Sequence, residues 1–345
     1  MGKKGENYDE LVDDDDDTNS KVEDEIEELV RNLPQGINMV DGGRLCNYNN
    51  FWCRVRFLRP ILNSQKYFKA HDTDIIVPTL PKSGTTWLKA LTFSILNRTI
   101  CSINQSPLLT TNPHDLVPQL ELKFFANLDH EKNIFPTSPR LYATHVPYHL
   151  LSNSIHESNC RMIYICRNPL DYFISYRFFL LENEFESEEK HSLSLEESFD
   201  MFCRGIYPYG PFWDHVLGYW NAHLKNPDRV LFLKYEDLKE DIVLNVKKIA
   251  DFMGFGFSED EEKRGVIEEI VKLCSLENMK KLEVNKTGVF SGSVIEVKNC
   301  SFFRKGEVGD WANYLTPEMI ERFDKITEAK LQGSGLNFKY SDKDI

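Results

Sequence analysis

Asp74-Ile75-Ile76-Val77-Pro78-Thr79-Leu80 leads directly into Pro81-Lys82-Ser83-Gly84-Thr85-Thr86-Trp87, and a helical pattern continues from Thr85 to Leu96. The apolar run is typical of a buried β-strand, and the small residues after it form a loop that opens a helix. Free backbone N–H groups and the positive end of the helix dipole meet at such a point, which suits an anion. Gly84 permits a close backbone approach.

This loop differs from the Walker A motif, G-x-x-x-x-G-K-[S/T], because Lys82 precedes the glycine instead of following it. Lys82 supplies a positive charge, while Ser83, Thr85 and Thr86 supply hydroxyl donors. As an isolated string, it is explained equally well by an anion site and by an ordinary strand-to-helix turn.

Short apolar runs alternate with helical patterns along the rest of the chain. The expected strands lie at residues 74–80, 141–144, 161–166 and 229–233, and the expected helices at 85–96, 170–181, 195–204, 211–224, 242–253, 260–273 and 317–331. This alternation predicts a mainly parallel central sheet flanked by helices on both faces. With 345 residues and no convincing linker, we predict a single large α/β domain.

Acidic residues are concentrated at the N-terminus. Residues 1–30 hold 13 Asp and Glu against three lysines, so the other 315 residues contribute only −3 to the net charge of −13. A nearly neutral body disfavours nucleic-acid binding. We expect residues 1–20 to be a disordered acidic tail and residues 21–74 to be an N-terminal helical and aromatic segment of the same domain as residues 75–340.

Targeting and metal signals are absent from the sequence. It has neither a signal peptide nor a run of about 18 apolar residues, so we expect no membrane association. Its eight cysteines include no C-x-x-C pair and no cluster with histidines at zinc spacing. These features predict a cytoplasmic protein without a metal site.

Three distant strings resemble the signatures of one family. T-L-P-K-S-G-T-T-W-L-K-A-L at residues 79–91 resembles the 5′-phosphosulfate loop of the cytosolic sulfotransferases, which move a sulfuryl group from 3′-phosphoadenosine 5′-phosphosulfate (PAPS) to a hydroxyl or amine. R-M-I-Y-I-C-R-N-P at 161–169 resembles their 3′-phosphate segment, and F-F-R-K-G-E-V-G-D-W at 302–311 their R-K-G-x-x-G-D-W signature. The resemblance covers about residues 45–340 and implies the P-loop NTPase-like sulfotransferase fold for residues 75–340.

The same resemblance implies a binding site for PAPS as co-substrate, made by three loops. Its residues are Lys82, Ser83, Gly84, Thr85, Thr86 and Trp87 in the first loop, Arg167 and Ser175 in the second, and Arg304, Lys305 and Gly306 in the third. An arginine fork suits phosphate oxygens. Trp87 would stack on adenine, and Tyr235, in a K-Y-E-D-L string, would touch the nucleotide. Cys274-Ser275-Leu276 replaces the Thr-Ser-Phe of many members, which leaves those adenine contacts open.

The catalytic residues are also implied by the resemblance. S-P-R-L-Y-A-T-H-V-P at 138–147 resembles the family strand that ends in T-H-x-P and supplies the base, here His145. An imidazole can take the proton of an attacking hydroxyl at neutral pH. Lys82 would steady the bridging oxygen as 3′-phosphoadenosine 5′-phosphate (PAP) leaves, and Ser83 would restrain Lys82 until the acceptor arrives. Positioning and donors can serve this transfer without Mg²⁺.

Several features indicate the plant branch of the family. Ala143 stands where many animal members have a lysine, and T-N-P-H-D-L-V-P at 111–118 is plant-like. Plant relatives sulfonate flavonols, brassinosteroids, hydroxyjasmonates and desulfoglucosinolates, and the flavonol and hydroxyjasmonate members are the most similar. A pocket for a small hydroxylated acceptor could draw on aromatic residues, although ordinary packing explains each one as well: Phe51, Trp52, Tyr148, Tyr207 and Tyr209.

The expected assembly is a monomer. Animal members dimerise through K-x-x-x-T-V-x-x-x-E, but here Ala312 replaces the lysine and Pro317 replaces the valine and removes a backbone donor. Two other functions are kept as alternatives, namely a P-loop kinase and a catalytically weak or silent PAPS-binding protein. The second is disfavoured because all six charged or polar site residues are present: Lys82, His145, Arg167, Ser175, Arg304 and Lys305.

Overall fold

Four parallel strands form the centre of the molecule in the computed structural model, which describes residues 26–123, 139–183, 193–292 and 295–340. The strands are β4 (Ile75–Pro78), β5 (Leu141–Thr144), β6 (Arg161–Cys166) and β7 (Val230–Lys234). Their order in the sheet is β5-β4-β6-β7, and every pairing is parallel. The predicted parallel sheet is therefore confirmed, with β5 and β6 at the residues expected.

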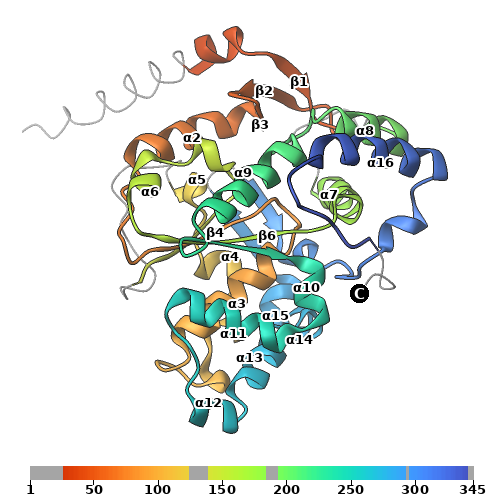
Figure 1. Cartoon of the computed structure of the whole chain (residues 1–345). Helices are drawn as coiled ribbons and strands as arrows, with labels where there is room; N and C mark the ends of the chain where they lie inside the picture. The colour runs from red at the N-terminus through yellow and green to blue at the C-terminus, as the bar shows by residue number, and fades with distance from the viewer. Residues whose placement is uncertain (1–25, 124–138, 184–192, 293–294, 341–345) are drawn as a thin grey trace, which may run out of the picture.

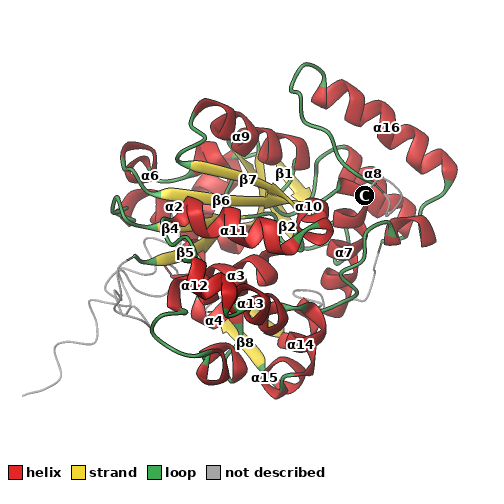
Figure 2. Ribbon diagram, turned by 60° about the horizontal axis from the view of Figure 1, so that its bottom comes forward, coloured by secondary structure: helices red, strands yellow, loops and turns green. Residues whose placement is uncertain are grey.

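The sheet buries both of its faces, because alternate side chains of each strand belong to different cores. Helices lie on both sides of the sheet (Figure 2). On β6, Met162 and Tyr164 pack into one core, whereas Ile163 and Ile165 pack into the other. A strand that is covered twice must be apolar throughout, and this explains the continuous R-M-I-Y-I-C run. The predicted single α/β fold is confirmed.

Helices cover the two faces in separate layers (Figure 1). One layer contains α2 (Val55–Tyr67), α7 (Pro169–Glu182), α8 (Leu195–Cys203), α9 (Phe212–Lys225) and α16 (Pro317–Leu331). The other contains α3 (Thr85–Asn97), α10 (Tyr235–Glu240), α11 (Ile242–Met253), α13 (Val266–Cys274) and α14 (Leu276–Lys281). The predicted helices at 85–96, 170–181, 195–204, 211–224, 242–253 and 317–331 are all confirmed within one residue at each end.

Two parts of the sequence fold differently from expectation. The helix predicted at 260–273 is two helices, α12 (Glu259–Lys263) and α13, because Gly265 adopts φ +76° and interrupts the helical backbone. The aromatic stretch after residue 47 contributes to a small antiparallel sheet of β1 (Gln35–Ile37), β2 (Arg44–Tyr48) and β3 (Phe51–Arg54). The hydrophobic pattern of these short strands gave no alternation long enough to predict them.

The remaining described elements are short. They are α4 (Pro113–Leu116), α5 (Leu120–Lys123), α6 (Asn153–Glu157), α15 (Glu283–Thr287) and the hairpin β8 (Val289–Gly292) and β9 (Ile295–Lys298), with 3-10 turns at Ile103–Gln105, Pro107–Leu109, Tyr148–Leu150, Asn299–Phe302 and Asp310–Asn313. Residues 26–32 are helical. None of the described helices is long and apolar enough to cross a membrane. The expected tail at 1–20 lies outside the described residues, and the division at residue 74 stays a prediction.

Parallel pairing brings four chain segments to one edge of the sheet. The carboxyl ends of β4, β5, β6 and β7 are followed by the Pro81–Gly84 loop, His145, Arg167 and Tyr235. Ligands of open α/β sheets bind at this edge. The fold therefore predicts a common site for segments up to about 160 residues apart.

A substitution in α16 can test how the C-terminal segment packs on the core. Phe323 is the only fully buried residue of α16, and its ring packs against Phe199, Phe202 and Trp213. We expect Phe323→Ala to lower the free energy of unfolding by about 3 to 5 kcal/mol, because it leaves a cavity between α16 and the core. Urea denaturation, monitored by circular dichroism, would measure this change in the free energy of unfolding.

Glu328→Ala is the matched control, because Glu328 is exposed on the same helix. Equal stability losses in the two variants would contradict this account of how α16 is held.

Candidate active site

The loop after β4 has an unusual backbone that its sequence explains. Gly84 adopts φ +107° at the N-terminal end of α3, and Lys82 has φ +66°. A Cβ atom at position 84 would lie 3.0 Å from Tyr235 Cδ2 and 3.1 Å from Ile165 Cδ1. The glycine is thus required twice, by its dihedral angle and by the side chains of β6 and α10 that lie against it.

Hydroxyl groups of this loop have separate partners. Thr85 Oγ1 lies 2.8 Å from Thr79 Oγ1, and Thr86 Oγ1 lies 2.9 Å from His114 Nε2. Ser83 is fully buried, and its Oγ has no hydrogen-bond partner within the described ranges. A buried hydroxyl without a hydrogen-bond partner is energetically costly.

Lys82 lies between the loop and the C-terminal segment. Its Nζ donates to the Ser301 carbonyl at 2.8 Å and stands 4.6 Å from the centre of the Phe179 ring. Burial lowers the pKa of Lys82 to about 7, and the positive charges of Arg304 and Arg167 also lower it, against an opposing effect of Glu182. An anion beside Lys82 would favour its charged form.

His145 follows β5 and is oriented by the end of β4. Its Nδ1 lies 2.7 Å from the Thr79 carbonyl oxygen, and an oxygen of this kind can only accept. Nδ1 therefore carries the proton, and Nε2 keeps the lone pair. Burial lowers the pKa of His145 to about 3, so the ring is neutral at physiological pH. The residue lines a cavity, which makes a neutral base available to a ligand there.

A buried carboxylate accepts the backbone N–H of His145, and no motif in the sequence predicted this contact. Glu121 Oε1 accepts the backbone N–H of His145 at 2.7 Å and the Gln119 side-chain amide at 2.7 Å. Burial raises the pKa of Glu121. Glu121 lies between Leu120 and Leu122 on the short helix α5. This position in the sequence indicates that the glutamate is buried, but it does not indicate which group the carboxylate contacts.

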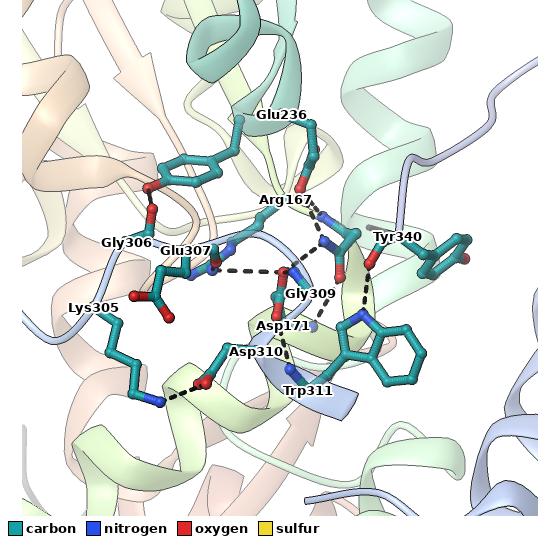
Figure 3. Close-up of polar contacts among 12 residues, drawn as sticks. Arg167, Asp171, Glu236, Lys305, Gly306, Glu307, Gly309, Asp310, Trp311 and Tyr340 are labelled. Atoms are coloured by element: carbon teal, nitrogen blue, oxygen red, sulfur yellow. Dashed lines mark hydrogen bonds and ion pairs between the residues drawn. The ribbon is translucent and has the colours of Figure 1, made fainter. Parts of the chain in front are cut away.

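The second and third predicted loops meet through one carboxylate (Figure 3). Asp171, at the start of α7, accepts the backbone N–H of Gly309 at 2.8 Å and that of Trp311 at 3.1 Å. It also accepts Asn168 Nδ2 at 2.8 Å and forms an ion pair with Arg167 at 3.6 Å. The acid thus ties the C-terminal loop to the end of β6.

Arg167 is buried where these loops meet. Its guanidinium donates to the Glu307 carbonyl and lies 4.7 Å from the centre of the Tyr235 ring (Figure 3). Its Nε, like Arg304 Nε, is buried and has no partner among the residues that the structure describes. Both arginines line the cavity, so their spare donors fit the oxygens of an anionic ligand.

Tyr235 connects the third loop to the first. Its hydroxyl donates to the Gly306 carbonyl at 2.9 Å, and its ring meets Trp87 edge-on at 5.5 Å. A Cβ at Gly306 would lie 2.5 Å from Leu276 Cδ2, so only glycine fits there at φ +68°. The open question at Cys274-Ser275-Leu276 is partly answered, because Ser275 and Leu276 line the cavity while Cys274 is buried.

The structure gathers most, but not all, of the predicted site residues around one cavity of about 360 Å³. Those that line it are Lys82, Gly84, Thr85, Thr86, Trp87, His145, Arg167, Ser175, Tyr235, Arg304 and Gly306. Ser83 lies behind the loop and does not line it. Lys305 is exposed, and its Nζ pairs with Asp310 at 2.6 Å.

Of the five aromatic residues expected to form an acceptor pocket, Tyr209 alone lines this cavity. Phe51 and Tyr207 are buried in the core, and Tyr148 packs edge-on against Tyr219. Ordinary packing, the alternative that the sequence left open for each residue, therefore describes Phe51, Tyr148 and Tyr207 in this structure. The cavity is also lined by residues that sequence reasoning missed: Phe57, Leu122, Tyr176, Phe179, Leu180 and Pro208.

The cavity is strongly cationic. No Asp or Glu is among its lining residues, whereas Arg54, Arg56, Lys82, Arg167, Lys239 and Arg304 all are. Within the described residues, no group of three or more His, Cys, Asp or Glu could hold a metal ion. The arrangement is thus suited to a polyanionic organic ligand beside a neutral base.

Comparisons with known proteins agree with this geometry. Residues 72–335 match the family described as "Sulfotransferase domain". "Cytosolic sulfotransferase 15" of Arabidopsis thaliana is 45% identical over 324 residues, which cover 92% of this chain and 88% of that protein. "Flavonol 3-sulfotransferase" of Flaveria bidentis is 44% identical, over 91% of this chain and 100% of its own. The crystal structure of mouse sulfotransferase SULT7A1 complexed with PAP has a TM-score of 0.64 and 28% identity, and the match covers 84% of this chain and 95% of that one.

Asp171 offers a test of how the loops are joined. We expect Asp171→Asn to lower the free energy of unfolding by about 3 to 5 kcal/mol. The asparagine amide has one oxygen, so it cannot accept both the Gly309 and the Trp311 N–H groups as the two carboxylate oxygens do, and it also removes the charge that pairs with Arg167. Chemical denaturation would measure the change. Asp228→Asn, at an exposed aspartate, is the control, and an Asp171→Asn variant as stable as this control would contradict the proposed link.

Proposed function

Because the chain belongs to the sulfotransferase family, we propose that it transfers a sulfuryl group from PAPS to a hydroxyl of a small plant metabolite, such as a flavonol, a hydroxyjasmonate or a brassinosteroid. The observation that carries this proposal is a single cavity in which a neutral His145 faces the three cationic loops. The cytoplasmic location expected from the sequence agrees with the names of the relatives.

The residues present fit the donor. Backbone N–H groups at the start of α3, with Thr85 and Thr86, suit its 5′-phosphosulfate. Arg167, Ser175 and Arg304 suit its 3′-phosphate, and both arginines have a spare buried Nε. Trp87 offers a ring to adenine. Lys305 would act there only indirectly, by holding Asp310 beside Arg304.

His145 and Lys82 divide the chemistry in this proposal. His145 Nε2 accepts the proton of the acceptor hydroxyl as its oxygen bonds to sulfur, while Nδ1 stays on the Thr79 carbonyl and fixes the ring. The bond between sulfur and the phosphate oxygen breaks, and Lys82 leaves the Ser301 carbonyl to balance the negative charge on that oxygen. Negative charge in the cavity raises the pKa of both side chains, which favours these roles.

The direct test is transfer of ³⁵S from labelled PAPS to a panel of flavonols, brassinosteroids, hydroxyjasmonate and desulfoglucosinolates, with EDTA present. Label on one acceptor would support the reaction and our proposal that it needs no metal. Tight PAP binding without transfer would favour the alternative of a weak or silent PAPS-binding protein. Transfer of phosphate from ATP instead would favour the P-loop kinase.

His145→Ala tests the base. We expect PAP binding by calorimetry to stay within about twofold, because the imidazole does not hold the nucleotide, while kcat falls about a thousandfold through loss of the proton acceptor. His71→Ala is the control, since His71 is exposed and does not line the cavity. Full activity in His145→Ala would remove this residue from the mechanism.

The pKa of Lys82 predicts a pH dependence of PAP affinity. Below pH 7 the free protein already carries the charged lysine that an anion needs. Above pH 7 binding must also take up a proton, so we expect the dissociation constant to rise with a slope approaching tenfold per pH unit. Lys82→Met should bind PAP more weakly and show a flatter pH profile between pH 7 and 9. An unchanged slope in that variant would assign the proton to another group.

The assembly stays a prediction. We propose a monomer, because Pro317 begins α16 at the position where animal members use a dimer contact.

A further inference from the structure

A buried lysine lies beneath the cationic cavity, and neither the fold nor the proposed transfer explains it. Lys89, on α3, is fully buried, although long charged side chains are seldom found inside a protein without a partner. Its Nζ donates to the Val117 carbonyl at 2.9 Å and lies 3.3 Å from His114 Nδ1. Glu121 and Asp115 oppose the loss of its charge by burial.

His114 connects this lysine to the cavity. The ring stacks on Phe302 with a centre-to-centre distance of 4.1 Å, and its Nε2 lies 2.9 Å from Thr86 Oγ1. Burial, together with the positive charge of Lys89, holds the pKa of His114 well below its usual range. The ring is therefore neutral, with one nitrogen that donates and one that accepts.

Lys89, His114 and Thr86 form a series of hydrogen bonds, and the charged state of Lys89 at one end determines the direction of each bond. Burial lowers the pKa of Lys89 to about 7, against the opposing effect of Glu121 and Asp115. The charged form of Lys89 has donors only, and in that form it makes His114 Nδ1 the acceptor. His114 Nε2 then carries the proton and donates to Thr86 Oγ1. The hydroxyl of Thr86 uses its oxygen to accept, so its own hydrogen stays available, and no second partner for it lies within the described residues. Thr86 lines the cavity.

We propose that Lys89 and His114 are positioning residues that fix the Thr86 hydroxyl as a hydrogen-bond donor to the anion held by the loop after β4. The inference rests on the proposed function, because it takes PAPS or PAP as that anion. Without the hydrogen bonds from Lys89 to His114 and from His114 to Thr86, the Thr86 hydroxyl could equally donate to His114. Its oxygen lone pairs, instead of its hydrogen, would then face the anion.

The loop that carries His114 is built to hold this ring. The backbone N–H of His114 donates to Asn112 Oδ1 at 2.9 Å, and Asn112 Nδ2 donates to Asn285 Oδ1 at 2.9 Å. Asn285 in turn donates to the Met279 carbonyl at 2.9 Å. These three hydrogen bonds anchor α4 to α14 and α15 and so fix the backbone that carries His114, while the stacking on Phe302 holds the ring itself.

A double-mutant cycle on PAP affinity, measured by calorimetry, tests the proposal. Thr86→Val should raise the dissociation constant about tenfold, the cost of one hydrogen bond to a charged group. His114→Phe preserves the stacking on Phe302 and should raise it about threefold to tenfold. The double variant should bind like Thr86→Val alone, because His114 acts through Thr86. Multiplicative losses would overturn the proposal and show that His114 contacts the ligand itself or acts on the fold.

Two further measurements separate positioning from packing. His114→Gln can still donate to Thr86 and should restore most of the affinity lost in His114→Phe, whereas a purely structural histidine would predict no such rescue. Nitrogen NMR of ¹⁵N-histidine-labelled protein should show His114 protonated on Nε2 and His145 on Nδ1, and the opposite tautomer of His114 would overturn the proposal. A wild-type protein that binds no PAP would instead remove the proposed function on which the inference rests.

Discussion

The parallel pairing of four strands is the constraint on which the candidate site depends. Because β4, β5, β6 and β7 run in the same direction, the residues that follow them must meet at one edge of the sheet. His145 is then placed by two strands at once, by its position after β5 and by the Thr79 carbonyl that follows β4. A shift of one residue in the pairing of β4 with β5 would reverse which side chains enter each core, so the register also fixes the base.

The second constraint is electrostatic. Six lysines and arginines line a cavity that no acidic side chain lines, and burial lowers the pKa of Lys82 to about 7 and that of His145 to about 3. The positive charges in such a cavity repel one another when it contains only water. An anionic ligand reduces this repulsion, and its binding increases the stability of the folded protein. The acids that are present act from outside the lining, where Asp171, Asp310 and Glu121 hold N–H groups and cations in place.

The sequence was sufficient where local chemistry determines structure. The apolar run of β6 and the glycine of the first loop have local causes, and so do the N-terminal ends of α11 and α16, which the side chains of Asp241 and Thr316 cap. All of these elements were predicted within one residue. The motif residues were predicted through family resemblance, and eleven of them line one cavity. Contacts between distant segments could not be predicted in this way. Glu121 and His114 belong to no pattern that states their partners, and the strands β1 to β3 are too short to show a period. The role of Lys305 stays a prediction, because a motif position does not say which way a side chain turns and its Nζ pairs with Asp310 here.

The carboxylate of Asp171 has a consequence for how the protein is made. It accepts N–H groups from residues 138 and 140 positions further along the chain, so the side of the cavity that holds Arg167 is closed by a segment that is synthesised long after that arginine. A ribosome-bound chain can pair all four central strands before Gly309 and Trp311 emerge. This side of the cavity is therefore completed only after Gly309 and Trp311 have been made, and any transcript that ends before them would yield a sheet with its first loop formed but without the N–H groups that Asp171 accepts.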